Sequence, residues 1–231
     1  FAMKYNVKKF IMVSTDKAVN PTNVMGATKR VAEIYANCLN TQGKTKFVTT
    51  RFGNVLGSNG SLIPLFKRQI ENGGPLTVTH KDITRFFMTI PEACQLVLEA
   101  GVMGTGGEIY VFDMGESVKI FDLAKKMIHL SGRKYPEDID INVTGLRPGE
   151  KLYVELLSTE ENTIPTYNEK IMIARTDNMN VEEIKKKIDH LIADLNLEHV
   201  QIVKKIKAIV PEYISNNSEF EKLDKVEVKV K

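Results

Sequence analysis

Short apolar runs alternate with longer amphipathic stretches along the first part of the chain. Residues 10–14 form a short, almost continuously apolar segment, which is typical of a buried parallel strand. Residues 24–41 have an amphipathic helical pattern, and Gly43 follows at a position where helices often end. Residues 46–51 are rich in β-branched side chains and predict the next strand. This β-α-β order indicates a doubly wound α/β sheet.

The same two patterns continue to residue 209, and several helix starts carry capping residues. Thr89 and Glu92 form a capping-box pattern, which Asn180 and Glu183 repeat. Ser117 is expected to cap the helix that follows it. Strands are predicted at residues 76–79, 108–112, 139–143 and 170–174, and helices at residues 63–71, 90–103, 118–130, 181–195 and 198–209.

Composition and charge narrow the class of protein. The 231 residues include 32 basic and 29 acidic side chains, and the resulting net charge of +3 is too small to indicate a nucleic-acid partner. Hydrophobic residues make up 42% and charged residues 26%, which excludes disorder and a disulfide scaffold. Cys38 and Cys94 are far apart, which favours a reduced, cytoplasmic protein. No apolar run of about 18 residues occurs, so no membrane span is predicted, and the scattered histidines indicate no metal site.

A polar cluster follows the first predicted strand directly. Ser14, Thr15, Asp16 and Lys17 stand where the carboxyl ends of parallel strands line a ligand crevice. A hydroxyl, a carboxyl and an amine in this position can act as a positioning group, a general acid and a general base. A polar turn that holds a local ion pair is the alternative interpretation.

Two residues on the next helix are also candidates. Met25 and Lys29 are four positions apart, so they lie on one helix face. A thioether neither donates nor accepts a proton at any useful pH. Taken alone, Met25 is therefore better explained as a core filler than as a catalyst.

The wider context of this cluster resembles a known family. The matching blocks are residues 14–29 (STDKAVNPTNVMGATK), 51–58 (RFGNVLGS), 74–80 (GPLTVTH), 84–93 (TRFFMTIPEA), 146–152 (LRPGEKL) and 210–213 (VPEY). Together they resemble the extended short-chain dehydrogenase/reductase superfamily. They are most similar to the nucleotide-sugar 4,6-dehydratases of polysaccharide biosynthesis, which act on UDP-N-acetylglucosamine.

The resemblance implies a catalytic role for each residue that matches the family pattern. Asp16 would protonate the departing C6 hydroxyl, and Lys17 would remove the C5 proton. Thr15 would hold the C4 oxygen, and Lys29 would bind the nicotinamide ribose of NAD. Met25 occupies the position of the usual tyrosine base.

The resemblance also implies binding residues for the cofactor and the substrate. Besides Lys29, the expected NAD contacts are Ser14, Arg51 and Phe52. The expected contacts with the UDP-sugar are Asn54, Ser61, Leu62, Pro64, Thr77, Arg85, Arg147 and Glu150. Arginines suit a diphosphate because a guanidinium can donate two hydrogen bonds to it.

Two departures from the family pattern change what we expect of the catalytic base and of NAD binding. The replacement of tyrosine by Met25 leaves the base that oxidises C4 open between Asp16, Lys17 and a bound water. Large membrane-anchored members commonly show this methionine. The glycine fingerprint that binds a dinucleotide pyrophosphate is missing after every predicted strand. We therefore expect this chain alone to bind NAD poorly and to be inactive.

The expected architecture follows from the same resemblance. The fold is predicted as α/β, with an incomplete, second-half Rossmann-like parallel sheet and a smaller α/β substrate-binding domain. Residues 1–60 would belong to the sheet domain, with later segments returning to it, and residues 61–180 to the substrate domain. Residues 181–213 would form C-terminal helices, and residues 214–231 a flexible tail.

The chain opens like the end of a helix leading to a buried strand, so we expect a fragment of a longer parent. The parent would form a homo-oligomer, with a possible upstream membrane anchor on the cytoplasmic face of the inner membrane. Its product would feed capsule or O-antigen synthesis. A nucleotide-sugar 4-epimerase and a non-catalytic nucleotide-sugar-binding module remain alternatives. An acid and a base after Thr15 favour dehydration, whereas Met25 favours the binding module.

Overall fold

The computed structural model describes the chain except residues 59, 156, 158–162, 175–179, 194–196 and 225–231. Its main sheet has five strands in the order β1-β2-β7-β11-β10. The strands β1 (Lys9–Val13), β2 (Lys46–Arg51) and β7 (Ile109–Phe112) are parallel. The strands β11 (Ile171–Ala174) and β10 (Thr163–Pro165) continue the sheet in antiparallel pairing. The carboxyl ends of β1 and β2 therefore lie at the same edge of the sheet.

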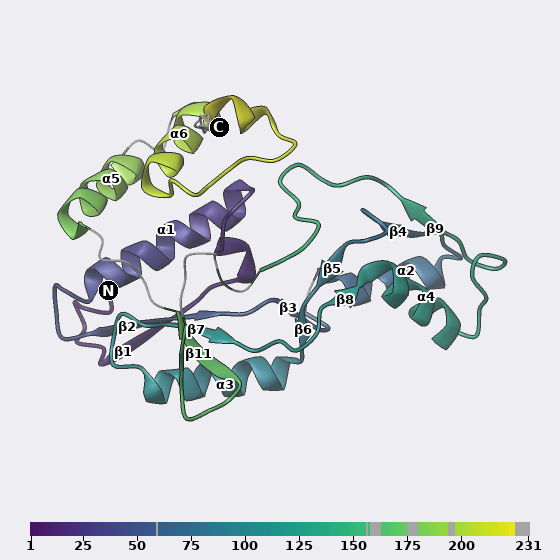
Figure 1. Ribbon diagram of the computed structural model, residues 1–231, viewed down its shortest axis with the longest axis horizontal. Coiled ribbons are helices and arrows are strands. Elements are labelled where there is room, and N and C mark those ends of the chain that lie inside the picture. The colour runs from purple at the N-terminus through teal and green to yellow at the C-terminus, as the bar shows by residue number, and fades with distance from the viewer. Residues whose placement is uncertain (59, 156, 158–162, 175–179, 194–196, 225–231) are drawn as a thin grey trace, which may run out of the picture.

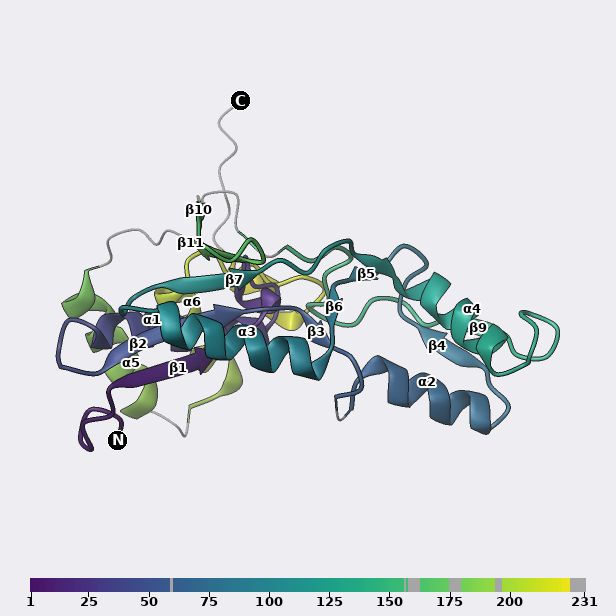
Figure 2. The same cartoon turned by 90° about the horizontal axis from the view of Figure 1, so that it is seen from below.

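Helices cover both faces of this sheet. The helix α1 (Val24–Leu39) lies on one face and α3 (Ile90–Met103) on the other (Figures 1 and 2). The helices α5 (Val181–Ala193) and α6 (His199–Ile209) pack on the outer side of α1. One core cluster joins α3 to the sheet through residues such as Val48 and Phe112, and another joins α1 to α5 and α6. Burying these apolar side chains is the main force that holds the layers together.

A second, smaller lobe extends from the carboxyl edge of the sheet (Figure 1). It contains α2 (Leu62–Glu71), α4 (Ile120–Leu130) and the parallel pair β4 (Leu76–Val78) and β9 (Ile141–Val143). Its core includes Phe66, Leu76 and Ile128, which are fully buried. Two short strand pairs lie between the lobes, namely β3 (Asn54–Val55) with β6 (Phe87–Met88) and β5 (Thr84–Arg85) with β8 (Val118–Lys119).

Local sequence explains where several helices begin and end. The Asn23 side chain accepts a hydrogen bond from the Gly26 amide and caps α1. Thr89 and Glu92 form the predicted capping box of α3. Gly132 takes a left-handed φ of 77° just after α4, a conformation that glycine adopts without strain.

The structure differs from the sequence-based expectation at β1 and at α4. The strand β1 was predicted to be buried, but it is the edge strand of the sheet and leaves Phe10 41% and Val13 45% exposed. Ser117 does not cap α4, which begins at Ile120 because residues 118–119 pair instead with β5.

The segment after α6 also differs from the expected flexible tail in the part that the structure describes. A short 3-10 helix, η2 (Glu219–Leu223), packs with Phe220 and Leu223 against the α1–α6 cluster. Asp224 forms an ion pair with Lys207 of α6. The end of the predicted tail at 225–231 and of the predicted helix at 194–195 lies outside the described residues. Among the described helices, none is long and apolar enough to cross a membrane.

Candidate active site between the two lobes

The polar cluster after β1 folds into a single 3-10 turn, η1 (Asp16–Ala18). The Thr15 hydroxyl donates to Asp16 Oδ1 at 2.8 Å and caps the turn by accepting from the Lys17 amide. Lys17 Nζ lies 2.9 Å from the same Asp16 oxygen. The Asp16 carboxyl is fully buried, whereas the Lys17 side chain is 30% exposed. The turn therefore presents a hydroxyl, a carboxyl and an amine that are connected by hydrogen bonds.

The segment from the end of β2 to the start of β3 supplies the next contacts. Lys17 Nζ also donates to Asn54 Oδ1 at 3.0 Å, so Asn54 belongs to the same polar group. The Asp16 amide donates to the Phe52 carbonyl at 3.1 Å. A Cβ atom on Gly53 would lie 3.1 Å from Asp16 Oδ2, so the absence of a side chain lets the two segments approach closely. Asp16 Oδ2 has no hydrogen-bond partner within the described part of the chain.

The first turn of α1 lies directly beside η1. A Cβ atom on Gly26 would lie only 2.1 Å from the Lys17 carbonyl oxygen, so a larger residue would push the helix away. Met25 is 49% exposed and lines a cavity of about 580 Å³ together with Lys17 and Asn54. Lys29 Nζ donates to the Val13 carbonyl, at the carboxyl end of β1, at 3.4 Å. Met25 is thus a wall of the cavity and not a core filler.

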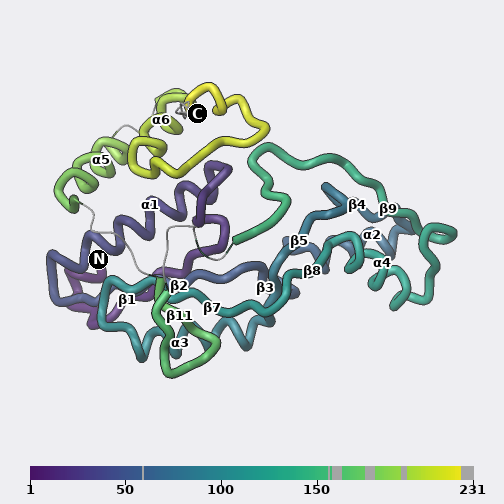
Figure 3. Tube along the Cα trace, in the orientation of Figure 1, coloured from purple at the N-terminus to yellow at the C-terminus, as the bar shows by residue number. Residues whose placement is uncertain are grey.

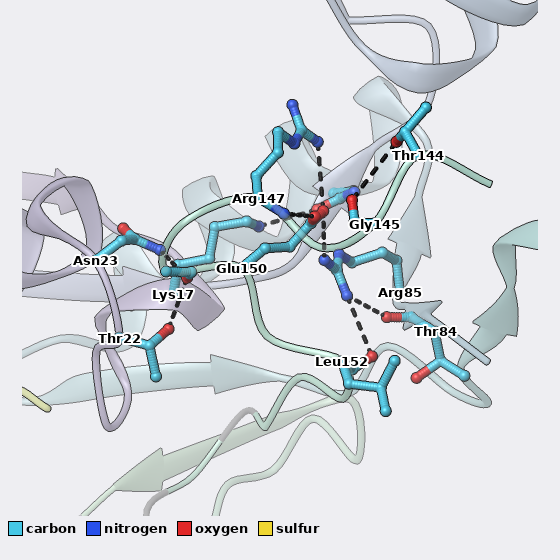
Figure 4. Close-up of polar contacts among 12 residues, drawn as sticks. Lys17, Thr22, Asn23, Thr84, Arg85, Thr144, Gly145, Arg147, Glu150 and Leu152 are labelled. Atoms are coloured by element: carbon cyan, nitrogen blue, oxygen red, sulfur yellow. Dashed lines mark hydrogen bonds and ion pairs between the residues drawn. The ribbon is translucent and has the colours of Figure 1, made fainter. Parts of the chain in front are cut away.

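Two arginines and a glutamate form the opposite side of the site (Figure 4). Glu150 Oε1 accepts from Arg85 Nη2 at 3.2 Å and from Arg147 Nη2 at 3.3 Å. Arg85 Nη1 also donates to the Thr84 carbonyl at 2.7 Å. Burial lowers the pKa of the Arg85 guanidinium, although the negative charges of Glu150 and Asp16 act in the opposite direction. Two positive groups share one carboxylate here, which leaves one positive charge in excess.

A second cavity, of about 610 Å³, opens on the other side of these arginines. Both cavities share four lining residues, namely Asn54, Arg85, Arg147 and Glu150. Ser61, Leu62 and Thr77 line the second cavity. Seven of the eight predicted substrate contacts therefore surround one cavity, and Pro64 is the member that does not line it.

Three predicted cofactor contacts are buried or partly buried. The Arg51 side chain is 1% exposed and forms two hydrogen bonds with Glu33 of α1, at 2.9 and 2.7 Å. The Phe52 ring stacks on Phe112, with ring centroids 5.6 Å apart. Ser14 is 4% exposed. These three side chains contribute to the core of this chain, and their contacts with NAD stay predictions.

The structure also brings residues to the site that the sequence did not assign. Thr22 and Asn23 both donate to the Gly149 carbonyl, at 2.8 and 2.9 Å. Lys151 lines the first cavity beside the C-terminal residues Tyr213 and Phe220. Lys151 stands in the matched block at 146–152 and Tyr213 in the matched block at 210–213, but neither carries an assigned role, and Phe220 lies outside every matched block. Within the described residues, no group of three metal-ligating side chains occurs.

Comparisons with known proteins identify the family. The sequence model of the family described as polysaccharide biosynthesis protein matches residues 1–176. The chain belongs to this family. The capsular polysaccharide biosynthesis protein CapD of Staphylococcus aureus is 57% identical over 195 residues, which cover 84% of this chain and 32% of CapD. The chain thus spans about a third of this relative.

Two further proteins are similar to this chain over most of its length. A UDP-glucose 4-epimerase of Rickettsia canadensis is 40% identical over 163 residues, covering 69% of this chain and 46% of that protein. The X-ray structure of Pen from Bacillus thuringiensis superposes with a TM-score of 0.68 at 32% identity, covering 82% of this chain and 64% of that chain. The predicted resemblance to the extended short-chain dehydrogenase/reductase superfamily and the predicted α/β fold are confirmed.

Proposed function

We propose that this chain acts as the C-terminal part of a UDP-N-acetylglucosamine 4,6-dehydratase. The parent enzyme would convert its substrate into a UDP-4-keto-6-deoxy sugar for capsule or O-antigen synthesis. The observation that carries this proposal is the hydrogen-bonded set of Thr15, Asp16, Lys17 and Asn54 beside a cavity. An acid and a base that adjoin each other suit the removal of a C5 proton and a C6 hydroxyl from neighbouring carbons.

The two groups can reach their working protonation states without an outside proton. Transfer of the shared proton from Lys17 Nζ to Asp16, along their 2.9 Å contact, produces a neutral amine and a carboxylic acid. The amine would then take the C5 proton, and the acid would give its proton to the departing C6 hydroxyl, which leaves as water. The Lys17 ammonium would return a proton to C5 when C6 receives the hydride. Asn54 holds Lys17 in place through its amide oxygen.

The proposed reaction needs NAD as its cofactor. The chain offers a residue for the nicotinamide ribose of NAD but no glycine fingerprint for its pyrophosphate. Lys29 lies at the carboxyl end of β1, where it would bind the nicotinamide ribose. No GxGxxG or GxxGxxG fingerprint follows a strand in this sequence, so the chain offers no site of that kind for the pyrophosphate. When bound, NAD would accept a hydride from C4 and return it to C6. Met25 cannot take the C4 hydroxyl proton, which leaves Asp16, Lys17 or a water as the acceptor.

The second cavity would hold the UDP moiety. Arg85 and Arg147 approach the junction of both cavities, so they would bind a diphosphate that joins a nucleoside on one side to a sugar on the other. Glu150 would then contact the ribose. Ser61, Leu62 and Thr77 would surround the nucleoside, and the sugar would extend toward Lys17 and Asn54.

The decisive experiment uses the parent protein, incubated with NAD⁺ and UDP-N-acetylglucosamine. We expect mass spectrometry to show a product that has lost one water. A product of unchanged mass that contains a sugar isomer would contradict dehydration. It would instead support a 4-epimerase, which the Rickettsia relative favours as the second candidate. Binding of UDP-N-acetylglucosamine without turnover would support the non-catalytic binding module, which Met25 favours.

A further inference from the structure

The loop at residues 147–155 contacts the catalytic turn as well as the proposed nucleotide site. Lys151 Nζ donates to the Val19 carbonyl at 2.8 Å. The Val19 amide in turn donates to the Asp16 carbonyl at 3.2 Å and closes η1. Val19 is 2% exposed, so Lys151 satisfies a carbonyl that lies away from solvent. The Lys151 contact thus holds the far end of the turn that carries Asp16 and Lys17.

The Lys151 side chain is half-buried. Burial lowers its pKa, while the negative charges of Glu155 and Asp16 oppose that shift. Asn20 adds a second link, since its side-chain amide donates to Glu155 at 3.1 Å. Asn20 has a left-handed φ of 39°, so the chain bends sharply at the point where both links attach.

The same loop also holds the start of α1. The Gly149 carbonyl accepts from Thr22 and Asn23, and the Asn23 side chain caps the helix that bears Met25 and Lys29. Figure 3 shows the chain after β9 running back from the smaller lobe to this end of α1. Two elements with candidate catalytic groups therefore rest on one loop, and Arg147 and Glu150 of that loop line the second cavity.

We propose that Lys151 is a positioning residue that couples UDP binding to the arrangement of the Asp16–Lys17 turn. The inference deepens the proposed function and rests on it. UDP would hold the loop through Arg147 and Glu150. The hydrogen bond from Lys151 would then limit the movement of Val19. Lys151 does not touch the reacting sugar in this role. Its contribution is to fix η1 once the nucleotide has bound.

Hydrogen exchange tests this coupling without any need for turnover. UDP is added to the 231-residue chain, and the exchange of amides is followed in two segments. We expect UDP to slow exchange at residues 76–85, which border the second cavity, and also at Ala18 and Val19. The slowing at Ala18 and Val19 should be about fivefold or more, the lower end of typical coupling between sites.

Three variants separate coupling from binding and from folding. Lys151→Met should bind UDP and protect residues 76–85 as before, but the added protection at Ala18 and Val19 should disappear. Lys151→Arg keeps a donor and should restore most of that protection. Lys126→Met removes an exposed lysine on α4 and should change neither segment. A melting curve of each variant shows whether the fold is intact.

The possible results have different meanings. If UDP protects residues 76–85 but never Ala18 and Val19, the nucleotide site stands and the coupling is wrong. If Lys151→Met keeps the full protection at Val19, Lys151 is not the coupling residue. If UDP protects neither segment, the nucleotide site of the proposed function fails, and the coupling fails with it.

Discussion

Asp16 and Lys17 form the most informative pair of side chains in the molecule. Asp16 is completely buried and binds the side chains of Thr15 and Lys17, and Lys17 also binds Asn54. A buried ion pair of this kind is weak evidence for a stabilising role, because desolvation offsets much of the attraction. Its place beside a cavity favours a catalytic interpretation.

Replacing either member of this pair should stop the reaction without stopping binding. We expect Lys17→Met and Asp16→Asn to lower kcat of the parent enzyme by roughly 10²–10⁴-fold, the usual contribution of a general acid or base. UDP affinity, measured by calorimetry, should stay close to that of the wild type. Lys126→Met serves as the control. Near-normal turnover in Lys17→Met would exclude Lys17 as the C5 base.

A substitution at Met25 tests whether its sulfur takes part in the reaction. Because a thioether carries no proton, Met25 can contribute only shape to the cavity that it lines. Met25→Leu, a swap of similar volume, should therefore change kcat by less than about tenfold, in line with the small cost of such swaps. A steady-state assay of the parent enzyme measures this. A much larger loss would show that the sulfur itself takes part.

At the scale of elements, the loop at 147–150 depends on a glycine. A Cβ atom on Gly149 would lie 2.5 Å from Asn23 Cβ and 2.7 Å from the Thr22 carbonyl, so Gly149→Ala should push the loop off α1. We expect about tenfold weaker UDP binding, a displacement cost of the order of 1.4 kcal/mol. Gly145→Ala is a matched control, because Gly145 also has a positive φ but has no atom within 4 Å of the added Cβ. Equal effects of both variants would contradict this account.

The sequence predicts the long elements well and the short ones poorly. Residues 46–51 and 24–41 have enough β-branched or amphipathic positions to predict β2 and all of α1 from local pattern, although α1 ends at Leu39, two residues before the predicted end. The pairs β3–β6 and β5–β8 have two residues per strand, so only tertiary contact creates them. The same contact delays the start of α4 to Ile120.

In the candidate site, too, the sequence predicts contacts between neighbouring residues but not contacts between distant ones. Asp16 and Lys17 are neighbours in sequence, and their place after a strand already indicates the crevice. Arg85 and Glu150 are 65 residues apart, and no periodicity predicts their ion pair. The family resemblance assigned both to the substrate, but it gave no role to Lys151, whose contact with Val19 spans 132 residues. Contacts of that range depend on the whole fold.

At the scale of the whole molecule, Glu33 connects three layers. Its buried carboxylate binds Arg51 of β2 and Arg30 of α1, and Arg30 also pairs with Glu212 after α6. Glu33→Gln removes the buried carboxylate that pairs with Arg51 and Arg30. We expect the free energy of unfolding to fall by about 3–5 kcal/mol, the usual cost of breaking a buried pair. Denaturant titration of the chain and of an exposed control, Glu182→Gln, measures the difference.

The Glu33 carboxyl also makes the stability of the chain depend on pH. Burial opposes ionisation of Glu33, but the hydrogen bonds and charge of Arg51, with the charge of Arg30, hold its pKa below the ordinary value. The stabilisation is therefore complete above about pH 4.3, the pKa of an unfolded glutamate, and is lost as the pH falls through the lower folded value. Glu33→Gln should flatten this acid-side loss of stability. An unchanged acid profile would exclude Glu33 as its source.

The 231-residue chain should bind UDP but should bind NAD only weakly. It contains the second cavity with Arg85, Arg147 and Thr77, so we expect it to bind UDP. It offers Lys29 to the cofactor, but no GxGxxG or GxxGxxG fingerprint follows a strand to hold the pyrophosphate through backbone amides. Calorimetry should therefore detect UDP binding and little NAD binding, and no dehydration should occur. Tight NAD binding would show that this chain holds the pyrophosphate by other groups, and the proposed division of the site would then be wrong.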